Sequence, residues 1–260
     1  MPLSPWPYPF WIAHRGAGRL APENTLAAFR VGASHGYRAF ECDVKLSADA
    51  VPFLIHDATL QRTTSAQGAA TALTWAELSR LDAGSWHGRT WAGEPLPSLD
   101  AIAQYCMHNG FALNIELKPP SFETARATGR RVAEAAAGLW MNATVVPPLL
   151  SSFEPEALAG ARDGAAQLPR ALLLDALRDG WLGEAVALGC VAVVAHHPLL
   201  DADVIGRIHD AGLRALSYTV NDPAEAGRLV ACGIDGLITD AVDRFAPGVS
   251  VLPEETDGAP

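Results

Sequence analysis

The chain has 260 residues with 29 acidic and 19 basic side chains, which gives a formal net charge of −10, and 49% of it is hydrophobic. This composition excludes an intrinsically disordered chain, because disorder requires low hydrophobicity and a high density of charge, and the length suits one large α/β domain. The acidic balance also argues against nucleic-acid binding, which needs a basic face, so an anionic ligand would have to be held by local positive charge.

Short β-rich runs alternate with Ala-rich helical stretches, which is the pattern of βαβ units around a parallel sheet. The predicted strands are Phe10–His14, Ala39–Cys42, Phe111–Leu117, Thr144–Leu150, Arg170–Leu174, Val191–Ala195, Arg214–Val220 and Gly236–Thr239. The predicted helices between them include Thr25–His35, Leu99–His108, Ala125–Leu139, Ala202–Ala211 and Ala224–Ala231. Eight such units fit a closed (β/α)8 TIM barrel. An open doubly wound sheet is the alternative.

The segment after the second predicted strand breaks this alternation. Asp43–Leu46 and Val51–His56 are both strand-like, and the link Ser47–Ala50 between them is too short for a helical crossover. Parallel strands need a crossover of about a dozen residues or more, so these two should form an antiparallel hairpin. Such a hairpin would bring His56 close to Glu41.

The stretch that follows is expected to be a small insertion, over about residues 57–97, before the barrel resumes. It contains a short predicted helix over Trp75–Leu81. It also carries Trp75, Trp86 and Trp91, whose expected role is to pack the insertion. We therefore predict a single catalytic domain over residues 1–245 and a flexible tail over residues 246–260.

Polar side chains gather where the predicted strands end, which in a TIM barrel is the face that carries the active site. The first strand ends at His14-Arg15, and the hairpin returns at His56. Side chains two positions apart on a strand share a face, so two further pairs can point into the same mouth. These pairs are Glu41 with Asp43, and Glu116 with Lys118.

Three carboxylates in one mouth, those of Glu41, Asp43 and Glu116, would repel one another unless a cation joined them. An all-oxygen set favours a hard divalent cation, Mg²⁺ or Ca²⁺, over zinc. A phosphodiester guest would balance the charge, because three carboxylates and one diester oppose the cation, Arg15 and Lys118. The sequence therefore predicts a metal site that takes a small-molecule phosphodiester.

The two histidines fit general acid–base catalysis of phosphodiester cleavage. One imidazole would take a proton from the nucleophile and the other would protonate the leaving alkoxide near neutral pH. Arg15 and Lys118 would contact the phosphoryl oxygens together with the cation. The residues leave open whether His14 or His56 is the acid, and whether the nucleophile is water or a substrate hydroxyl that first closes a cyclic phosphate.

The order and spacing of ten short motifs resemble the glycerophosphodiester phosphodiesterases of the bacterial cytoplasmic type, over nearly the whole chain. The motifs are His14-Arg15-Gly16, Glu23-Asn24-Thr25, Glu41-Cys42-Asp43-Val44, His56-Asp57, Arg62-Thr63-Thr64, Leu81-Asp82-Ala83-Gly84-Ser85-Trp86, Asn114-Ile115-Glu116-Leu117-Lys118, Ser152-Phe153, Tyr218-Thr219-Val220-Asn221 and Ile238-Thr239-Asp240. Tyr218 departs from the family pattern, since many members have tryptophan there.

This resemblance implies a TIM barrel with a small insertion between its second and third β/α units. It implies that Glu41, Asp43 and Glu116 bind the metal, that two histidines are the acid–base pair, and that two cations contact phosphate. These histidines are His14 and His56, and the cations are Arg15 and Lys118. The family hydrolyses deacylated phospholipids such as glycerophosphocholine to glycerol 3-phosphate and an alcohol.

Two other functions remain as alternatives. One is phospholipase-C-like or lysophospholipase-D-like cleavage of lipid phosphodiesters, which the negative net charge and the lack of a basic amphipathic helix disfavour. The other is a non-catalytic barrel that binds phosphodiesters as a sensor, which the presence of all three carboxylates and both histidines disfavours.

Several neighbouring polar residues are expected to support the site. Asn24 or Thr25 should cap the following helix, and Glu23 is not counted as a ligand. Asn221 and Asp240 lie at the ends of late strands, on the face of the active site.

The chain lacks the ~18 unbroken apolar residues that are needed to cross a bilayer. A signal peptide would carry a basic residue before its apolar segment, and this chain has none before its first apolar run. Its cysteines are Cys42, Cys106, Cys190 and Cys232. Two disulfides are possible in number, but wide spacing and apolar neighbours favour buried free thiols over disulfides or zinc. We expect a cytoplasmic protein without stable membrane anchoring, and the oligomeric state stays open.

Overall fold

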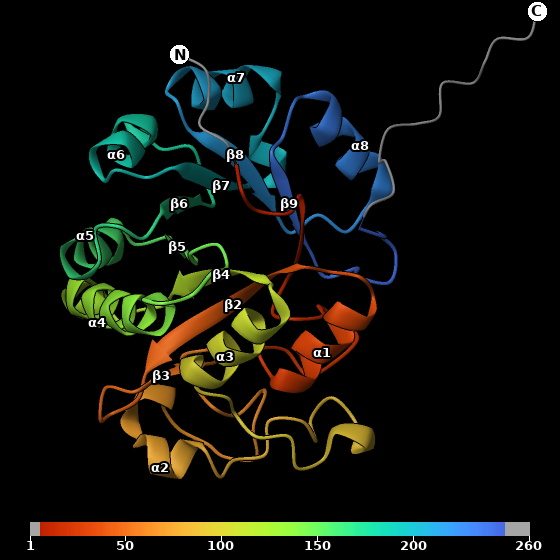
Figure 1. The fold of residues 1–260 in the computed structure, drawn as a ribbon, viewed down its shortest axis with the longest axis vertical. Coiled ribbons are helices and arrows are strands. Elements are labelled where there is room, and N and C mark those ends of the chain that lie inside the picture. Colours follow the sequence, from red (N-terminus) through yellow and green to blue (C-terminus); the bar gives the residue numbers. More distant parts are fainter. Residues whose placement is uncertain (1–5, 248–260) are drawn as a thin grey trace, which may run out of the picture.

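The computed structural model describes residues 6–247, and its centre is a closed barrel of parallel strands (Figure 1). The barrel strands are β1 (Trp11–Ala13), β2 (Ala39–Leu46), β4 (Ala112–Leu117), β5 (Leu149–Ser152), β6 (Arg170–Leu174), β7 (Ala192–His196), β8 (Arg214–Tyr218) and β9 (Gly236–Thr239). A further strand, β3 (Pro52–Leu54), pairs antiparallel with β2. The first strand pairs in parallel with both β9 and β2, at Ile12↔Ile238 and Ala13↔Phe40, so the sheet closes on itself. The predicted TIM barrel is confirmed, and the open doubly wound sheet is wrong.

Helices cover the outside of the barrel in Figure 1. They are α1 (Leu26–Ser34), α3 (Leu99–Asn109), α4 (Phe122–Trp140), α5 (Pro155–Gly164), α6 (Trp181–Ala187), α7 (Ala202–Asp210) and α8 (Pro223–Ala231). Short 3₁₀ turns lie at Ala70–Ala72, Arg89–Trp91 and His197–Leu199. The sequence pattern singled out five of these helices but not α5 and α6. Helix α6 is short and contains Gly183, which weakens its helical signal.

The strand predicted over Thr144–Leu150 is placed differently in the structure. It begins at Leu149 and continues to Ser152. Pro147 and Pro148 have no backbone N–H to donate to a ladder, so pairing starts only after them. The shift places Ser151 opposite Glu116 of β4, in the layer of the predicted active site.

Two apolar layers hold the barrel together. Residues that point inward, among them Ile12, Leu173 and Ile238, fill its interior. A larger cluster packs the outer face of the sheet against the helices, and there the rings of Phe29 and Phe40 stack with centroids 5.1 Å apart. Leu173 and Ile238 also line the cavity at the strand ends, so the inner layer forms the floor of that cavity.

The predicted hairpin is confirmed, because β2 and β3 pair antiparallel with Val44 opposite Leu54. The chain then leaves the barrel over residues 55–98 and packs around Phe53, Leu60 and Leu78 in a cluster of its own. Helix α2 (Trp75–Leu78) belongs to this segment, ends before the predicted Leu81, and lies at the bottom of Figure 1. The domain boundaries 1–245 stay a prediction. The part of the predicted tail that follows Pro247 lies outside the described residues.

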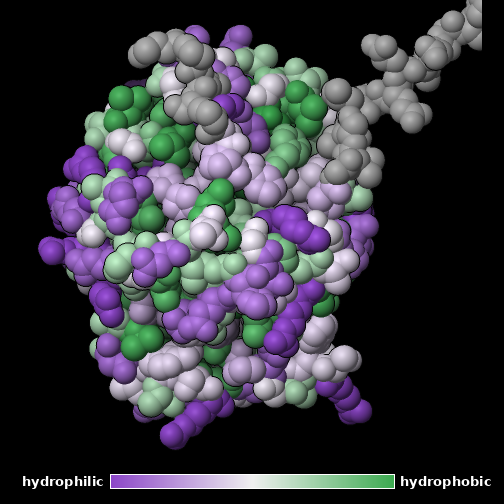
Figure 2. Space-filling view, viewed as in Figure 1, coloured by the Kyte–Doolittle hydropathy of each residue, from purple (hydrophilic) through white to green (hydrophobic). Residues whose placement is uncertain are grey.

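All four cysteines are free thiols, and Cys42, Cys106 and Cys190 are buried. Across residues 6–247, no helix is both long enough and apolar enough to span a membrane. On the face seen in Figure 2, hydrophilic residues are interspersed with small groups of apolar ones.

Candidate active site

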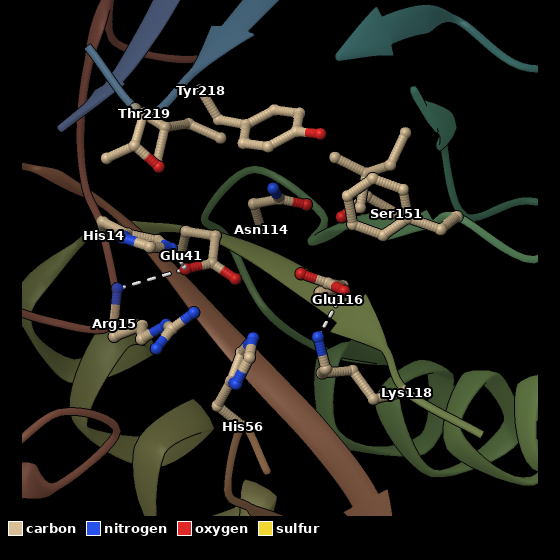
Figure 3. A pocket seen from close by; sticks show the side chains of 13 residues that line it. His14, Arg15, Glu41, His56, Asn114, Glu116, Lys118, Ser151, Tyr218 and Thr219 are labelled. Atoms are coloured by element: carbon tan, nitrogen blue, oxygen red, sulfur yellow. Dashed lines mark hydrogen bonds and ion pairs between the residues drawn. The ribbon is translucent and has the colours of Figure 1, made fainter. Parts of the chain in front are cut away.

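Six of the seven predicted site residues line one cavity of about 160 Å³ at the carboxyl ends of the barrel strands. They are His14, Arg15, Glu41, His56, Glu116 and Lys118 (Figure 3). The seventh, Asp43, contacts this group, because its Oδ1 is 3.4 Å from Lys118 Nζ and its Oδ2 is 3.2 Å from Arg15 Nε. The structure therefore brings all seven side chains together.

The three predicted metal ligands come from two adjacent parallel strands. β2 and β4 pair so that Asp43 lies opposite Glu116, and Glu41 lies two residues before Asp43 on the same face. Each residue offers one oxygen, and these oxygens lie within 4.8 Å of one another. Glu41 and Asp43 are only 3% and 1% exposed. The register of this strand pair thus creates a compact acidic cluster.

The acidic cluster fits a hard cation. Glu41 Oε1 is buried without a hydrogen-bond partner in the described part of the chain, and Asp43 Oδ1 has the ion pair with Lys118 Nζ at 3.4 Å but no hydrogen bond. A buried carboxylate oxygen without a partner is costly unless a cation satisfies it. The other oxygens have donors: Glu41 Oε2 accepts from the backbone N–H of Arg15 at 3.1 Å, and Glu116 Oε1 accepts from Lys118 Nζ at 2.9 Å. These contacts orient the carboxylates and leave free oxygens for a ligand.

Burial and charge shift the carboxylate pKa values in different directions. Burial, followed by repulsion from Asp43, raises the pKa of Glu41 from 4.5 to about 8, and the same two causes raise the pKa of Glu116. Although burial opposes it, the charges of Arg15 and Lys118 hold the pKa of Asp43 below its ordinary range. Without a cation, Asp43 carries the negative charge and Glu41 tends to keep its proton.

In the presence of a chelator, the wild-type protein should lose stability relative to a Glu41→Gln variant as the pH rises from about 4.5 to about 8. The pKa of Glu41 is higher in the folded state, so the stability it contributes is present below its unfolded pKa and lost as the pH rises through its folded pKa. Glutamine has no such proton. Urea unfolding should show the difference growing by up to about 1.4 kcal/mol per pH unit. A difference that stays constant over this range would contradict the raised pKa.

Arg15 and Lys118 place positive charge beside these carboxylates. Arg15 has a left-handed backbone, with φ of 50°, and its Nη1 donates to Glu23 at 2.9 Å. Burial would lower the pKa of each cation, but the charges of Asp43 and its neighbours raise both above their ordinary values. Both side chains therefore stay charged at the cavity, where an anion could contact them.

Each of the two histidine rings is held by the carboxylate of an aspartate. His14 Nδ1 lies 2.6 Å from an Asp240 oxygen, and His56 Nδ1 lies 2.9 Å from an Asp57 oxygen. Each contact leaves Nε2 free of that carboxylate, and both rings line the cavity in Figure 3. The pair resembles other acid–base pairs in which a second group fixes the orientation of each imidazole.

The environments of the two imidazoles shift their pKa values apart. Burial lowers the pKa of His14, but the hydrogen bond that its ring donates to Asp240 and the charge of Glu41 outweigh it and raise the pKa above 6.5. For His56, burial dominates the attraction of Asp43 and lowers the pKa below 6.5. Two groups with pKa values shifted apart suit one proton donor and one acceptor.

Arg62 connects the two sides of the site, and the sequence did not predict this role. Its Nε donates to Asp57 at 2.6 Å and its Nη1 donates to Glu23 at 2.8 Å. It thus joins the carboxylate that holds His56 to the one that holds Arg15. Its place in the motif Arg62-Thr63-Thr64 was a signal of importance, but the spacing did not reveal its partners.

Asn24 supports a carboxylate instead of capping a helix. Its Nδ2 donates to Asp43 Oδ2 at 2.7 Å, and its Oδ1 accepts from the Asp43 N–H at 3.0 Å. Thr25 is the residue that caps α1, by accepting from the Ala28 N–H. Asp240, predicted as a supporting residue, holds His14 and accepts in turn from Asn221 Nδ2 at 3.2 Å.

Comparison with known proteins agrees with this geometry. The model of the glycerophosphoryl diester phosphodiesterase family matches residues 14–244, a span that includes every predicted site residue. The chain belongs to this family. The predicted resemblance is confirmed, and both histidines and all three carboxylates lie within the matched span.

Individual family relatives cover nearly the whole chain. It is 32% identical to YhdW of Bacillus subtilis strain 168 over 238 residues, which are 89% of this chain and 94% of that protein. It is 29% identical to a glycerophosphodiester phosphodiesterase of Caldanaerobacter subterraneus subsp. tengcongensis, over 88% of this chain and 93% of the relative.

A solved structure of a relative adds a ligand to the comparison. A phosphodiesterase of Oleispira antarctica, in complex with the product sn-glycerol-3-phosphate, is 32% identical to this chain with a TM-score of 0.84, and the match covers 91% of this chain and 95% of that one. The fold and the family are therefore shared with an enzyme that binds a glycerol phosphate.

Proposed function

We propose that this protein hydrolyses glycerophosphodiesters, such as glycerophosphocholine, to glycerol 3-phosphate and an alcohol with a divalent cation, Mg²⁺ or Ca²⁺. One observation carries the proposal: two aspartate-held imidazoles and three clustered carboxylates, of which Glu41 has a buried oxygen without a partner, meet at one cavity. Family membership and the product-bound relative support the same substrate class.

Glu41, Asp43 and Glu116 would hold the cation. When bound, the cation would withdraw charge from the phosphoryl oxygens and offset the carboxylates around it. Arg15 and Lys118, which face the same cavity, would bind further phosphoryl oxygens and orient the diester. Because a backbone hydrogen bond and side-chain ion pairs already fix these groups, little reorganisation is needed when the substrate binds.

His14 and His56 would carry the proton transfers. One would accept a proton at Nε2 from water, or from a substrate hydroxyl in the cyclic route, and the other would donate a proton to the leaving alkoxide. Asp240 and Asp57 hold the opposite ring nitrogens, which fixes the tautomer and direction of each ring. A phosphodiester in the cavity would then lie between the two imidazoles.

Nothing in the structure favours the two alternatives over this function. Cleavage of lipid phosphodiesters and non-catalytic binding both use the same cavity, so activity measurements separate them. We propose that the protein acts on a small-molecule substrate, and that it neither binds nucleic acid nor is stably anchored to a membrane. A cytoplasmic location stays a prediction.

Chelation should abolish the release of glycerol 3-phosphate from glycerophosphocholine, and Mg²⁺ or Ca²⁺ should restore it, because the acidic cluster needs a cation to admit an anionic diester. A coupled enzymatic assay of glycerol 3-phosphate measures this, with lysophosphatidylcholine and phosphatidylinositol as parallel substrates. Unchanged turnover in excess chelator would reject the metal dependence. Turnover of the lipids alone would favour the first alternative, and binding without any turnover would favour the second.

A further inference from the structure

The guanidinium of Arg62 binds two carboxylates at once, each through two hydrogen bonds. Its Nε and Nη2 donate to the two oxygens of Asp57 at 2.6 and 2.9 Å, and its Nη1 and Nη2 donate to the two oxygens of Glu23, both at 2.8 Å. Two-point ion pairs of this kind fix a direction as well as a charge. Arg62 therefore holds the Asp57 carboxylate in one orientation, although 44% of its own side chain is exposed.

The two carboxylates come from different parts of the fold. Asp57 belongs to the segment that leaves the barrel after β3, and Glu23 lies in the loop between β1 and α1. The same segment also supports the cation, since Arg62 Cζ lies 6.0 Å from the centroid of the Trp86 ring. The segment over residues 55–98 thus delivers an aspartate and its cation to the site together.

The two aspartates that hold the histidine rings differ in their second partner. Asp57 contacts the His56 ring and accepts from the Arg62 guanidinium. Asp240 holds the other ring, and its second oxygen accepts from the neutral amide of Asn221 at 3.2 Å. An aspartate whose charge is offset by a guanidinium attracts a proton to its histidine only weakly, whereas one bound to an amide keeps that attraction.

The pKa values around His56 agree with this contrast. The hydrogen bonds from Arg62 hold the pKa of Asp57 below its ordinary range, although partial burial opposes them. Burial lowers the pKa of His56 below 6.5, and the attraction of Asp43 and the hydrogen bond with Asp57 do not reverse this. The charged groups that face the ring are Asp57 from its own segment, Asp43 from β2, Arg15 from the loop after β1 and Lys118 after β4. Arg62 reaches the ring through Asp57.

We propose that Arg62 is a positioning residue that holds Asp57 and offsets its charge, and thereby keeps the His56 ring oriented and free to accept a proton. The inference rests on the proposed function, in which His56 takes part in proton transfer. Arg62 acts through Asp57 and does not itself contact the diester. The segment outside the barrel would then control the state of one of the two histidines.

The test measures the protonation of His56 directly. Histidine side chains labelled with ¹³C are titrated by NMR in the Mg²⁺-loaded protein, and the His56 signal is identified by its loss in His56→Ala. In Arg62→Gln the pKa of His56 should rise by about half a pH unit or more, because the charge of Asp57 is no longer offset. Arg62→Lys keeps a positive charge and should show less than half of that shift.

The pH dependence of activity gives a second readout. In Arg62→Gln the acidic limb of kcat/KM for glycerophosphocholine should move to higher pH by the same amount as the His56 titration. In Arg62→Lys the limb should move back toward its wild-type position, while kcat at the optimum stays about tenfold low, because lysine lacks the two-point contact that fixes Asp57. A purely structural role would lower activity without moving the limb.

Arg126→Gln is the matched control. Arg126 also bridges two carboxylates, since it donates to Asp163 at 2.6 Å and to Glu156 at 3.2 Å. It lies on α4 with both partners on α5 and does not line the cavity, so its variant should keep the wild-type limb and the wild-type pKa of His56. If Arg62→Gln does not fold, Arg62→Met, with an unbranched apolar side chain beside Trp86, gives the same comparison.

The outcomes separate the role of Arg62 from the proposed function. An unshifted His56 pKa in folded Arg62→Gln would overturn the inference and leave the proposed function intact. A shift of the same size in Arg126→Gln would also overturn it. A metal-loaded wild-type protein that hydrolyses no glycerophosphodiester would overturn the proposed function, and the role of Arg62 in proton transfer would fall with it.

Discussion

Replacing Glu116 with glutamine should lower kcat/KM for glycerophosphocholine by at least ~10³-fold, because one of the three clustered oxygens would lose its charge. The fold should survive. Glutamine can still accept the hydrogen bond that Lys118 Nζ donates to Glu116 at 2.9 Å, and the change removes one charge from a group of repelling carboxylates. The loss would therefore come from the metal site and not from unfolding.

A thermal melt separates these two causes without measuring activity. A ligand that binds only the folded state raises the unfolding temperature, so Mg²⁺ or Ca²⁺ should stabilise the wild-type protein, and this shift should disappear in Glu116→Gln. Glu134→Gln is the control, because Glu134 is an exposed residue of α4 that pairs with Arg130. If Glu116→Gln keeps the full metal-induced shift, Glu116 is not a metal ligand.

Replacing His14 or His56 with alanine should cut turnover of glycerophosphocholine by ~10²–10⁴-fold, the usual contribution of a general acid or base. Each imidazole is held by its own aspartate at one ring nitrogen, so each removal leaves the other half of the proton transfer in place. Metal-induced stabilisation should persist in both variants, because neither histidine belongs to the acidic cluster.

Activity of the two variants on a diester with a p-nitrophenolate leaving group shows which histidine is the general acid. This leaving group needs no protonation, so only the variant that lacks the general acid should recover activity on it. The raised pKa of His14 and the lowered pKa of His56 favour His14 as the acid. His209→Ala is the matched control, since His209 also contacts an aspartate, Asp235, at 2.8 Å, but lies on α7. Wild-type rates in both histidine variants would remove the acid–base proposal.

The residues of the candidate active site were easier to predict from the sequence than the residues that hold their side chains in place. His14, Glu41 and Glu116 lie near the ends of the β-rich runs predicted from the sequence, and the parallel β/α pattern brings such ends to one face. The hairpin that returns His56 to this face followed from the short link before it. The partners of these residues come from distant segments, such as Asp240 for His14, and no local pattern encodes which carboxylate reaches which ring.

Two buried residues that line the cavity, Asn114 and Ser151, illustrate the same division. Asn114 was part of a recognised motif, but its unpaired amide becomes apparent only when every neighbouring donor and acceptor is placed. Ser151 fell outside the strand predicted over Thr144–Leu150, because apolar and β-branched residues suggested an earlier start than the two prolines allow.

The sequence by itself determined the barrel, the family and the seven residues at the mouth, because alternation of elements and short motifs are local properties of the chain. The tertiary structure alone decided which carboxylate oxygens remain free, which aspartates hold the histidines, and which strand pairs close the sheet. These features depend on register and on loop paths. Register is set by the packing of the whole sheet at once, and a shift of one residue would turn the strand residues Glu41, Asp43 and Glu116 to the opposite face.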